Sequence, residues 1–274
     1  PSSTAIDLGT GRTAVSVSVG QFHTCAILDN GEAKCWGRDH RGQLGDGGTN
    51  TDTNAPSSTA IDLGTGRTAI AVSAGHQHTC VILDNGDAKC WGLDNVGQLG
   101  DGGGNTNTNT PSSTAIDLGT NRTAVSVSAG HMHTCAILDN GEAKCWGQDA
   151  YGALGDGGSN TNTNAPSSTA IDLGTGRTAV AVSGGKLHTC AILDNGDAKC
   201  WGYDYYGHLG DGGSNTDQGS PVLLSGSDTW DSSTGLSSTG LSNFTASIEG
   251  ADLIIDEAMT NITFQYNATA ANGS

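Results

Sequence analysis

The stretch HTCAILDNGEAKCWG, from His23 to Gly37, occurs four times in the chain with few changes. Its later copies begin at His78, His133 and His188, so the period is 55 residues. A period of this length indicates one supersecondary unit per repeat, with neighbouring units stacked to share a core. The four repeats therefore form one array, and any function has to be built on it.

The stretch itself predicts a β-hairpin. The apolar run Cys25–Leu28 is followed by a three-residue loop that ends at Gly31, and glycine adopts a left-handed backbone at no steric cost. A loop centred on Asn30 places Cys25 opposite Cys35. Opposed residues in a hairpin have Cα atoms about 4.5–5.5 Å apart, which a disulfide can bridge.

Four disulfides are therefore expected, one in each repeat. Each closes an 11-residue loop, which is worth about 3 kcal/mol in the chain-entropy model. The predicted pairs are Cys25–Cys35, Cys80–Cys90, Cys135–Cys145 and Cys190–Cys200. Reduced thiols or a Cys/His metal site are the alternative, but zinc ligands usually come in closer pairs such as C-x-x-C. Regular pairing of an even number of cysteines indicates an oxidising compartment, so we expect an extracellular or cell-surface protein.

The repeats predict an all-β fold. Each one offers an opening strand such as Thr4–Leu8, an alternating strand such as Thr13–Ser18, and the two hairpin strands, while helical periodicity is absent. Four short strands per repeat is the pattern of a β-propeller blade, so we expect a four-repeat propeller array over residues 1–224. Pro221–Leu224 is a fifth copy of the opening strand, which either completes a blade or begins a connection.

Residues 225–274 differ in composition from the array. Residues 225–242 are rich in Ser, Thr and Gly, as in a flexible linker. Residues 243–274 predict a short C-terminal β segment with strands at Ala251–Ile255 and Ile262–Ala268, too small for a core of its own. Because Pro1 is in register with the first proline of the other repeats, we expect the chain to be a segment of a longer precursor.

The charge balance disfavours two classes of partner. The 274 residues include 28 acidic and 11 basic side chains, for a net charge of −17, which repels nucleic acid and anionic lipid surfaces. No run of about 18 apolar residues exists, so no membrane span is expected.

The repeat resembles the regulator of chromosome condensation family. The resemblance rests on VSAGHMHTCAILDNGEAKCWG and the following GALGDGG, at Val127–Gly147 and Gly152–Gly158, and on the other three copies. It implies a β-propeller whose members act as exchange factors, inhibitors or scaffolds, so it implies protein binding and no shared catalytic site. Members usually carry about seven repeats, and a cysteine pair is typical of secreted-looking versions. We also find no nucleophile elbow and no phosphate loop, so we expect neither an enzyme nor a cofactor.

Two kinds of repeated polar residue could bind metal. The tract that contains Asp46, Asn50, Asp52 and Asn54 offers oxygen ligands of the kind calcium prefers, but it lacks the spacing of a known calcium loop. A solvated strand edge is the favoured interpretation. His76 and His78 form an H-x-H pair that could hold a surface metal.

Residues that recur once per repeat are expected to be structural. The histidine at His23 and its three equivalents should bind a backbone carbonyl near a turn. Trp36 and its equivalents should be core plates of the blades, with sugar stacking as the alternative.

The positions that differ between repeats are the candidate binding surface. They lie in the two loops that flank each hairpin, and loops on a rigid scaffold often carry recognition. The fourth repeat has three tyrosines at these positions, and tyrosine is enriched at binding hot spots. Relaxed drift at exposed sites is the alternative. The candidates after the hairpin are Arg38, His40, Arg41, Leu93, Asn95, Val96, Gln148, Ala150, Tyr151, Tyr203, Tyr205 and Tyr206. The variable positions before the hairpin are Gln21, Phe22, His76, Gln77, His131, Met132, Lys186 and Leu187.

Glycosylation sequons give weaker support for an extracellular protein. They occur at Asn121, Asn243, Asn261, Asn267 and Asn272. The sequence thus predicts a non-enzymatic extracellular module for protein binding or adhesion. The alternative is a subunit of an extracellular filament or surface layer, in which the C-terminal segment adds a strand to a sheet of the next copy.

Overall fold

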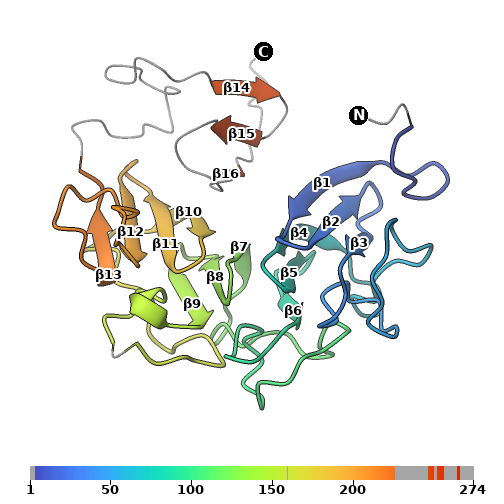
Figure 1. Ribbon diagram of the computed structural model, residues 1–274, viewed down its shortest axis with the longest axis horizontal. Coiled ribbons are helices and arrows are strands. Elements are labelled where there is room, and N and C mark those ends of the chain that lie inside the picture. Colours follow the sequence, from blue (N-terminus) through green and yellow to red (C-terminus); the bar gives the residue numbers. More distant parts are fainter. Residues whose placement is uncertain (1–3, 159, 226–245, 250–251, 256–263, 266–274) are drawn as a thin grey trace.

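In the computed structural model, residues 4–158, 160–225, 246–249, 252–255 and 264–265 are described. Each repeat forms an antiparallel sheet, and the four sheets follow one another around an arc (Figure 1). We number these sheets blades 1 to 4. Their strands are β1 (Ala14–Val19), β2 (His23–Leu28), β3 (Ala33–Gly37), β4 (Ala69–Ala74), β5 (His78–Leu83), β6 (Ala88–Gly92), β7 (Ala124–Ala129), β8 (His133–Leu138), β9 (Ala143–Gly147), β10 (Ala179–Gly184), β11 (His188–Leu193), β12 (Ala198–Gly202) and β13 (Gln218–Leu223).

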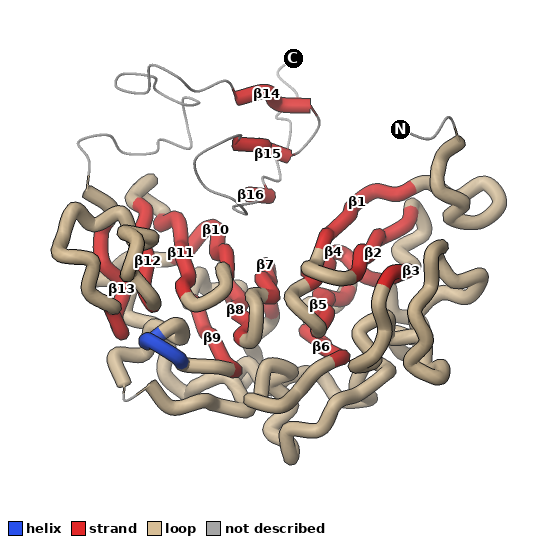
Figure 2. The backbone as a smooth tube through the Cα atoms, in the orientation of Figure 1, coloured by secondary structure: helices blue, strands red, loops and turns tan. Residues whose placement is uncertain are grey.

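The predicted hairpin register is confirmed. In blade 1, Cys25 pairs with Cys35 and Ile27 with Ala33, and Gly31 closes the turn at a φ of 79°. The cysteines of each hairpin are bonded as predicted, with Cα atoms 4.0–4.1 Å apart. The predicted β-propeller class is also confirmed, because the strands form successive blade-like antiparallel sheets (Figure 2).

The predicted opening strand is wrong for Thr4–Leu8 and its copies at the start of the later repeats. In blade 1, where a fourth strand was expected beside β3, the described chain makes only two isolated backbone contacts. Thr53 bridges to Gly37, and the Ile61 amide donates to the Ala33 carbonyl at 2.9 Å. The intervening segment is polar and includes Pro56, which has no amide proton to donate, so no ladder forms there. Among the described residues, blades 1 to 3 consequently have three strands each and not four.

Blade 4 differs because its fourth strand does form. β13 pairs with β12, so Pro221–Leu224 completes a blade rather than beginning a connection. The Leu224 amide donates to the Ala198 carbonyl, as Ile61 does to Ala33 in blade 1. The shorter segment between these contacts in blade 4 allows a continuous strand.

The hydrophobic core lies between blades. The cluster at the boundary of blades 1 and 2 includes Ile27 and Leu44 from the first repeat and Val72 and Trp91 from the second. Trp91, Trp146 and Trp201 are fully buried, which confirms the predicted core role for three of the four tryptophans that recur once per repeat. Each boundary thus joins one side of a blade to the opposite side of the next.

The C-terminal segment forms a small antiparallel sheet in the order β14-β15-β16. Its strands are β14 (Ala246–Glu249), β15 (Asp252–Ile255) and β16 (Phe264–Gln265). The last two lie inside the two predicted strands. Within the described residues, no helix has the length and apolar character that a membrane crossing requires.

Candidate binding face

The two variable loops of every blade meet at the same end of the sheet. In blade 1 the Arg38 amide, just after β3, donates to the Phe22 carbonyl, just before β2, at 2.9 Å. The same bond recurs in the other blades at 2.8–2.9 Å. Its partners are Leu93 and Gln77, Gln148 and Met132, and Tyr203 and Leu187. The variable positions therefore share one end of the array, which we call the variable face.

Neighbouring blades are also joined within this face. The Gln21 amide donates to Gly75 at 3.2 Å, the His76 amide to Gly130 at 3.2 Å, and the His131 amide to Gly185 at 3.0 Å. The loops before the hairpins consequently form one continuous row. Side chains that are 55 residues apart in sequence become direct neighbours.

An aromatic column runs along this row. The Arg38 guanidinium carbon lies 4.9 Å from the Phe22 ring centroid, and Phe22 lies 5.3 Å from the His76 ring. The His76 and His131 rings are stacked with centroids 4.0 Å apart. Burial, with further contributions from His131, Arg38 and Lys186, lowers the pKa of His76 to about 4. Both stacked imidazoles are therefore uncharged at neutral pH, since burial also lowers the pKa of His131.

The cations of the chain divide into framework and variable positions. Eight of the 11 basic residues recur at two fixed positions, at Arg12 and Lys34 and their equivalents. The arginines form ion pairs with Asp29, Asp84, Asp139 and Asp194. Lys34, Lys89 and Lys144 donate to backbone carbonyls. The other three, Arg38, Arg41 and Lys186, all lie on the variable face and pair with no carboxylate of the described residues.

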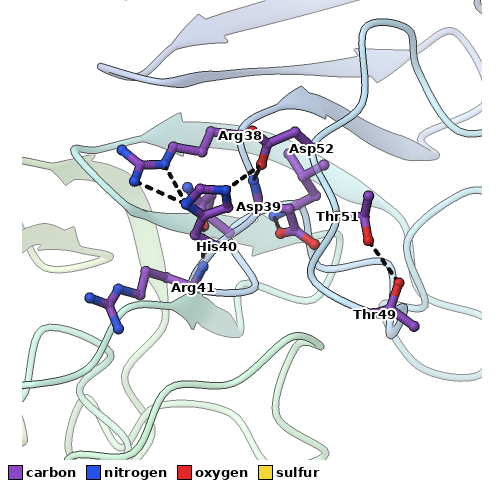
Figure 3. Close-up of polar contacts among 9 residues, drawn as sticks. Arg38, Asp39, His40, Arg41, Thr49, Thr51 and Asp52 are labelled. Carbon is purple, nitrogen blue, oxygen red and sulfur yellow. Dashed lines mark hydrogen bonds and ion pairs between the residues drawn. The ribbon is translucent and has the colours of Figure 1, made fainter.

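The blade 1 loop is held by a polar network (Figure 3). The Arg38 Nε donates to the His40 Nδ1 at 3.1 Å, and the His40 Nε2 lies 3.3 Å from Asp52. The Asp52 carboxylate also accepts the Asp39 amide at 2.9 Å. The Arg41 side chain extends away from this network (Figure 3), and its guanidinium makes no hydrogen bond or ion pair with a described residue.

Two of the four calcium candidates, Asp46 and Asp52, are engaged in local contacts. Asp46 accepts the Gly48 amide at 2.8 Å, Asp52 serves the network above, and Asn50 adopts a left-handed φ of 54°. In the described part of the chain, no group of three or more His, Cys, Asp or Glu side chains is placed to hold a metal. Calcium binding at these residues stays an untested alternative to the favoured solvated strand edge.

Tyrosines form a second aromatic cluster on the variable face. Tyr151 of the third repeat lies 4.8 Å from Tyr203, and Tyr205 lies 4.8 Å from Tyr206, measured between ring centroids. Tyr205 is 64% exposed and Tyr206 77% exposed. Leu93, by contrast, is a buried candidate at 6% exposure and is not available to a partner.

The recurrent histidines are structural, but their partner is not the predicted backbone carbonyl. The His23 Nε2 lies 2.7 Å from the Thr79 Oγ1 of the next repeat, and the Thr79 hydroxyl donates to the Gln43 carbonyl at 2.8 Å. His78 makes the same bond to Thr134, so its Nε2 is engaged at a blade boundary and is not available for the surface metal pair considered for His76 and His78. His78 is fully buried at a blade boundary, while His76 stacks on His131.

One recurrent carboxylate was missed in the sequence. Asp39 is fully buried, its Oδ1 accepts the Leu44 amide at 2.9 Å, and its Oδ2 has no partner within the described structure. Burial, partly opposed by that bond, raises its pKa to about 6. Equivalent residues are Asp94, Asp149 and Asp204. An acidic residue two places after each Trp-Gly pair was the available signal.

Of the glycosylation candidates, only Asn121 lies in the described residues. It is exposed and has a φ of 57° where the other repeats have a glycine. Asparagine tolerates this left-handed conformation better than most residues. Asn243, Asn261, Asn267 and Asn272 fall outside the described residues.

The repeats match the regulator of chromosome condensation (RCC1) repeat at residues 14–43, 69–98, 124–153 and 179–207, and a second description of the same repeat at 30–82 and 85–137. The chain belongs to the RCC1 repeat family. Ultraviolet-B receptor UVR8 of Arabidopsis thaliana is 31% identical over 76% of this chain and 45% of that protein. E3 ubiquitin-protein ligase HERC2 of Homo sapiens is 28% identical over 77% of this chain and 4% of that protein.

Solved RCC1 propellers share the fold. The structure of human WBSCR16 has a TM-score of 0.67 at 20% identity and covers 78% of this chain and 52% of its own. Yeast RCC1 (Prp20) bound to Kap60 has a TM-score of 0.67 at 19% identity and covers 81% of this chain and 51% of its own. The chain thus spans about half the length of these propellers and less than half of UVR8.

Proposed function

We propose that this RCC1 array is a non-enzymatic extracellular module that binds a protein partner through its variable face. The observation that carries the proposal is the convergence of the variable loops, which gathers the differences between repeats at one end of an otherwise uniform scaffold. Loops held by a rigid scaffold are suited to recognition. RCC1 propellers provide precedent, because yeast RCC1 was solved with Kap60 bound and Prp20p has binding properties toward Gsp1p and histones.

The chemistry of the face indicates an acidic partner segment. Arg38, Arg41 and Lys186 are the basic residues outside the framework positions on a protein of net charge −17, and Arg38 lies over the exposed Phe22 ring. A carboxylate can pair with a guanidinium, and an apolar residue beside it can pack on Phe22 or on the tyrosines. Opposite charge across an interface mainly favours orientation and rapid association.

The four disulfides support the extracellular part of the proposal, since such bonds persist in oxidising compartments. We do not propose a ligase activity from the similarity to HERC2, because that similarity covers only 4% of HERC2. Glycosylation at Asn121, in an exposed turn, would agree with the same location.

A random peptide library provides the test. Peptides selected on the wild-type chain should be enriched in Asp and Glu, and their affinity should fall at least tenfold for Arg38→Ala with Lys186→Ala. The triple variant Tyr203→Ala, Tyr205→Ala and Tyr206→Ala should also lose affinity with little change in melting temperature. The control is Arg12→Ala, whose side chain pairs with Asp29 at the other end of blade 1. Selected peptides that lose affinity for the control, and not for the face variants, would refute the proposal.

A filament subunit is the second candidate function. The last strand of the C-terminal sheet, β16, pairs with β15 and has no second partner strand among the described strands. Such an edge can add to a sheet of another copy. Deletion of Ser225–Ser274 should then abolish polymers and leave the disulfide-bonded array intact. Polymers that survive the deletion would exclude this route.

A further inference from the structure

The three boundaries between blades use one set of contacts. At the first, the His23 imidazole meets the Thr79 hydroxyl, and the Trp91 indole donates to the Gln43 carbonyl at 3.0 Å. The Ala74 amide also donates to the Ser18 Oγ at 2.9 Å. The second and third boundaries repeat all of these bonds at equivalent residues.

Each blade therefore has two different sides. The side that faces the next blade carries the serine, the histidine, the disulfide and the accepting carbonyl, and we call it the imidazole side. The side that faces the preceding blade carries a valine, the threonine and the tryptophan, and we call it the indole side. In β5 and β8 both sides are covered, and every residue of these strands is buried.

The indole side of blade 1 is partly uncovered in the described structure, although Ala26 and Leu28 on the same side are buried. Val17 is 55% exposed, whereas its equivalent Val72 in blade 2 is 5% exposed. Trp36 is partly exposed, unlike the buried Trp91. The Thr24 hydroxyl and the Trp36 indole make no hydrogen bond to any described residue, although their equivalents bond to the preceding repeat.

Within the described residues no further blade covers the imidazole side of blade 4, although β16 lies near β10. Along β11 the residues His188, Cys190 and Ile192 are partly exposed, while the alternate residues are buried. Ser183 lies beside them, and its hydroxyl accepts no amide from a described residue. Gly210 meets no indole ring, although Gly45, Gly100 and Gly155 each pack directly against a tryptophan.

We propose that the imidazole side of blade 4 docks onto the indole side of blade 1 of a second copy of this chain. These two surfaces carry the residue types of the three boundaries already formed within one copy. They include Gly210, the equivalent of the glycines that pack against a tryptophan ring. The expected bonds join His188 to Thr24 of the second copy, and the Ser183 hydroxyl to its Val19 amide. The proposal goes beyond the proposed function and does not rest on it.

The array has about half the extent of a complete propeller. One copy covers 52% of the WBSCR16 propeller and 51% of Prp20, so two copies supply about the extent of one such propeller. Each copy offers one imidazole side and one indole side, so a head-to-tail pair can use both boundaries and close. Closure limits the assembly to a discrete dimer.

Sedimentation of two complementary variants provides the test. The wild-type chain should sediment at twice its mass of 27.5 kDa. Val17→Glu blocks the indole side and Ser183→Glu blocks the imidazole side, so each variant alone should be monomeric. Mixed in equal amounts, they should form a heterodimer, because one intact boundary remains between them. Assembly through the C-terminal strands would not give this complementation.

A matched pair of substitutions separates docking from folding. Thr24→Val should weaken the dimer at least tenfold and leave the melting temperature of the monomer unchanged. Thr79→Val, the same change at an internal boundary, should lower the melting temperature and leave dimer affinity unchanged. A monomeric wild-type chain overturns the proposal. This would be the result if the C-terminal segment of the same chain covered the imidazole side of blade 4. Blocking variants that still associate alone, or that fail to pair when mixed, also overturn it.

Discussion

His78 and Thr134 lie in neighbouring blades, and the imidazole Nε2 is 2.9 Å from the hydroxyl Oγ1. The Thr134 hydroxyl donates its proton to the Gln98 carbonyl at 2.8 Å. Because a hydroxyl has only one proton to donate, the imidazole must donate from Nε2, and its buried Nδ1 carries no proton. Each blade boundary thus depends on a neutral histidine of one defined tautomer.

The boundaries should weaken in acid. Burial lowers the pKa of His23 to about 4, of His78 to about 3 and of His133 to about 4, against an unfolded value of 6.5. Between pH 6.5 and 4 the unfolded chain binds more protons than the fold, so the histidines make the free energy of unfolding fall as the pH falls. Urea midpoints at pH 7.5 and 6.0 should show this decrease. An unchanged or higher midpoint at pH 6.0 would contradict the neutral-histidine boundary.

Asp39 should act with the opposite sign. Burial raises its pKa to about 6 from 3.8, so the folded chain binds the extra proton between these values and Asp39 contributes more stability as the pH falls. Asp39→Asn mimics the protonated acid and should raise the free energy of unfolding by about 1–3 kcal/mol at pH 7.5. The gain should shrink toward pH 4. A variant that is equally stabilised at both pH values would show that the charge of Asp39 is not the cause.

Loss of the threonine hydroxyl should be costly only at a boundary. Thr134→Val leaves the His78 Nε2 without its buried partner, so the free energy of unfolding should fall by about 1–3 kcal/mol. The control is Thr24→Val, whose hydroxyl has no partner in the described structure and whose loss should change stability by less than about 0.5 kcal/mol. Equal losses for the two variants, measured by urea unfolding of the monomer, would contradict the assigned role.

The hairpin register and the disulfides could be predicted because they are local. The spacing of Cys25, Gly31 and Cys35 defines the pairing within 11 residues. The prediction of an opening strand was wrong because Thr4–Leu8 has the residue pattern of a strand. Its copies in the later repeats make only single backbone hydrogen bonds to the preceding repeat and no ladder. The His78–Thr134 bond was missed for a related reason, since its partners are 56 positions apart and no local pattern joins them.

The variable face was predicted in part. The sequence identified the two loops that differ between repeats, and the hairpin register explains why they meet at one end. The stack of His76 on His131 was not predicted, because it depends on how one blade sits against the next. Leu93 was included from its variability alone, and only packing reveals that it is buried.

Removal of one disulfide should lower stability without loss of the fold. Replacing Cys80 and Cys90 together by alanine opens one constrained loop and should cost about 3 kcal/mol in the free energy of unfolding. Peptide mapping of the non-reduced variant should still find the other three intra-repeat links. Links between different repeats in the wild-type chain would contradict the assigned pairing.

The most direct test of the binding face is an array with a uniform face. In this variant the variable positions of repeats 1, 2 and 4, apart from the buried Leu93, take the third-repeat residues, which are His131, Met132, Gln148, Ala150 and Tyr151. The control makes the opposite hairpin turns uniform, by Glu32→Asp and Glu142→Asp. Titration with a peptide selected on the wild-type chain should show at least a tenfold loss of affinity for the uniform-face variant, an unchanged affinity for the control, and similar melting temperatures for all three. Unchanged affinity for a folded uniform-face variant would contradict recognition through this face.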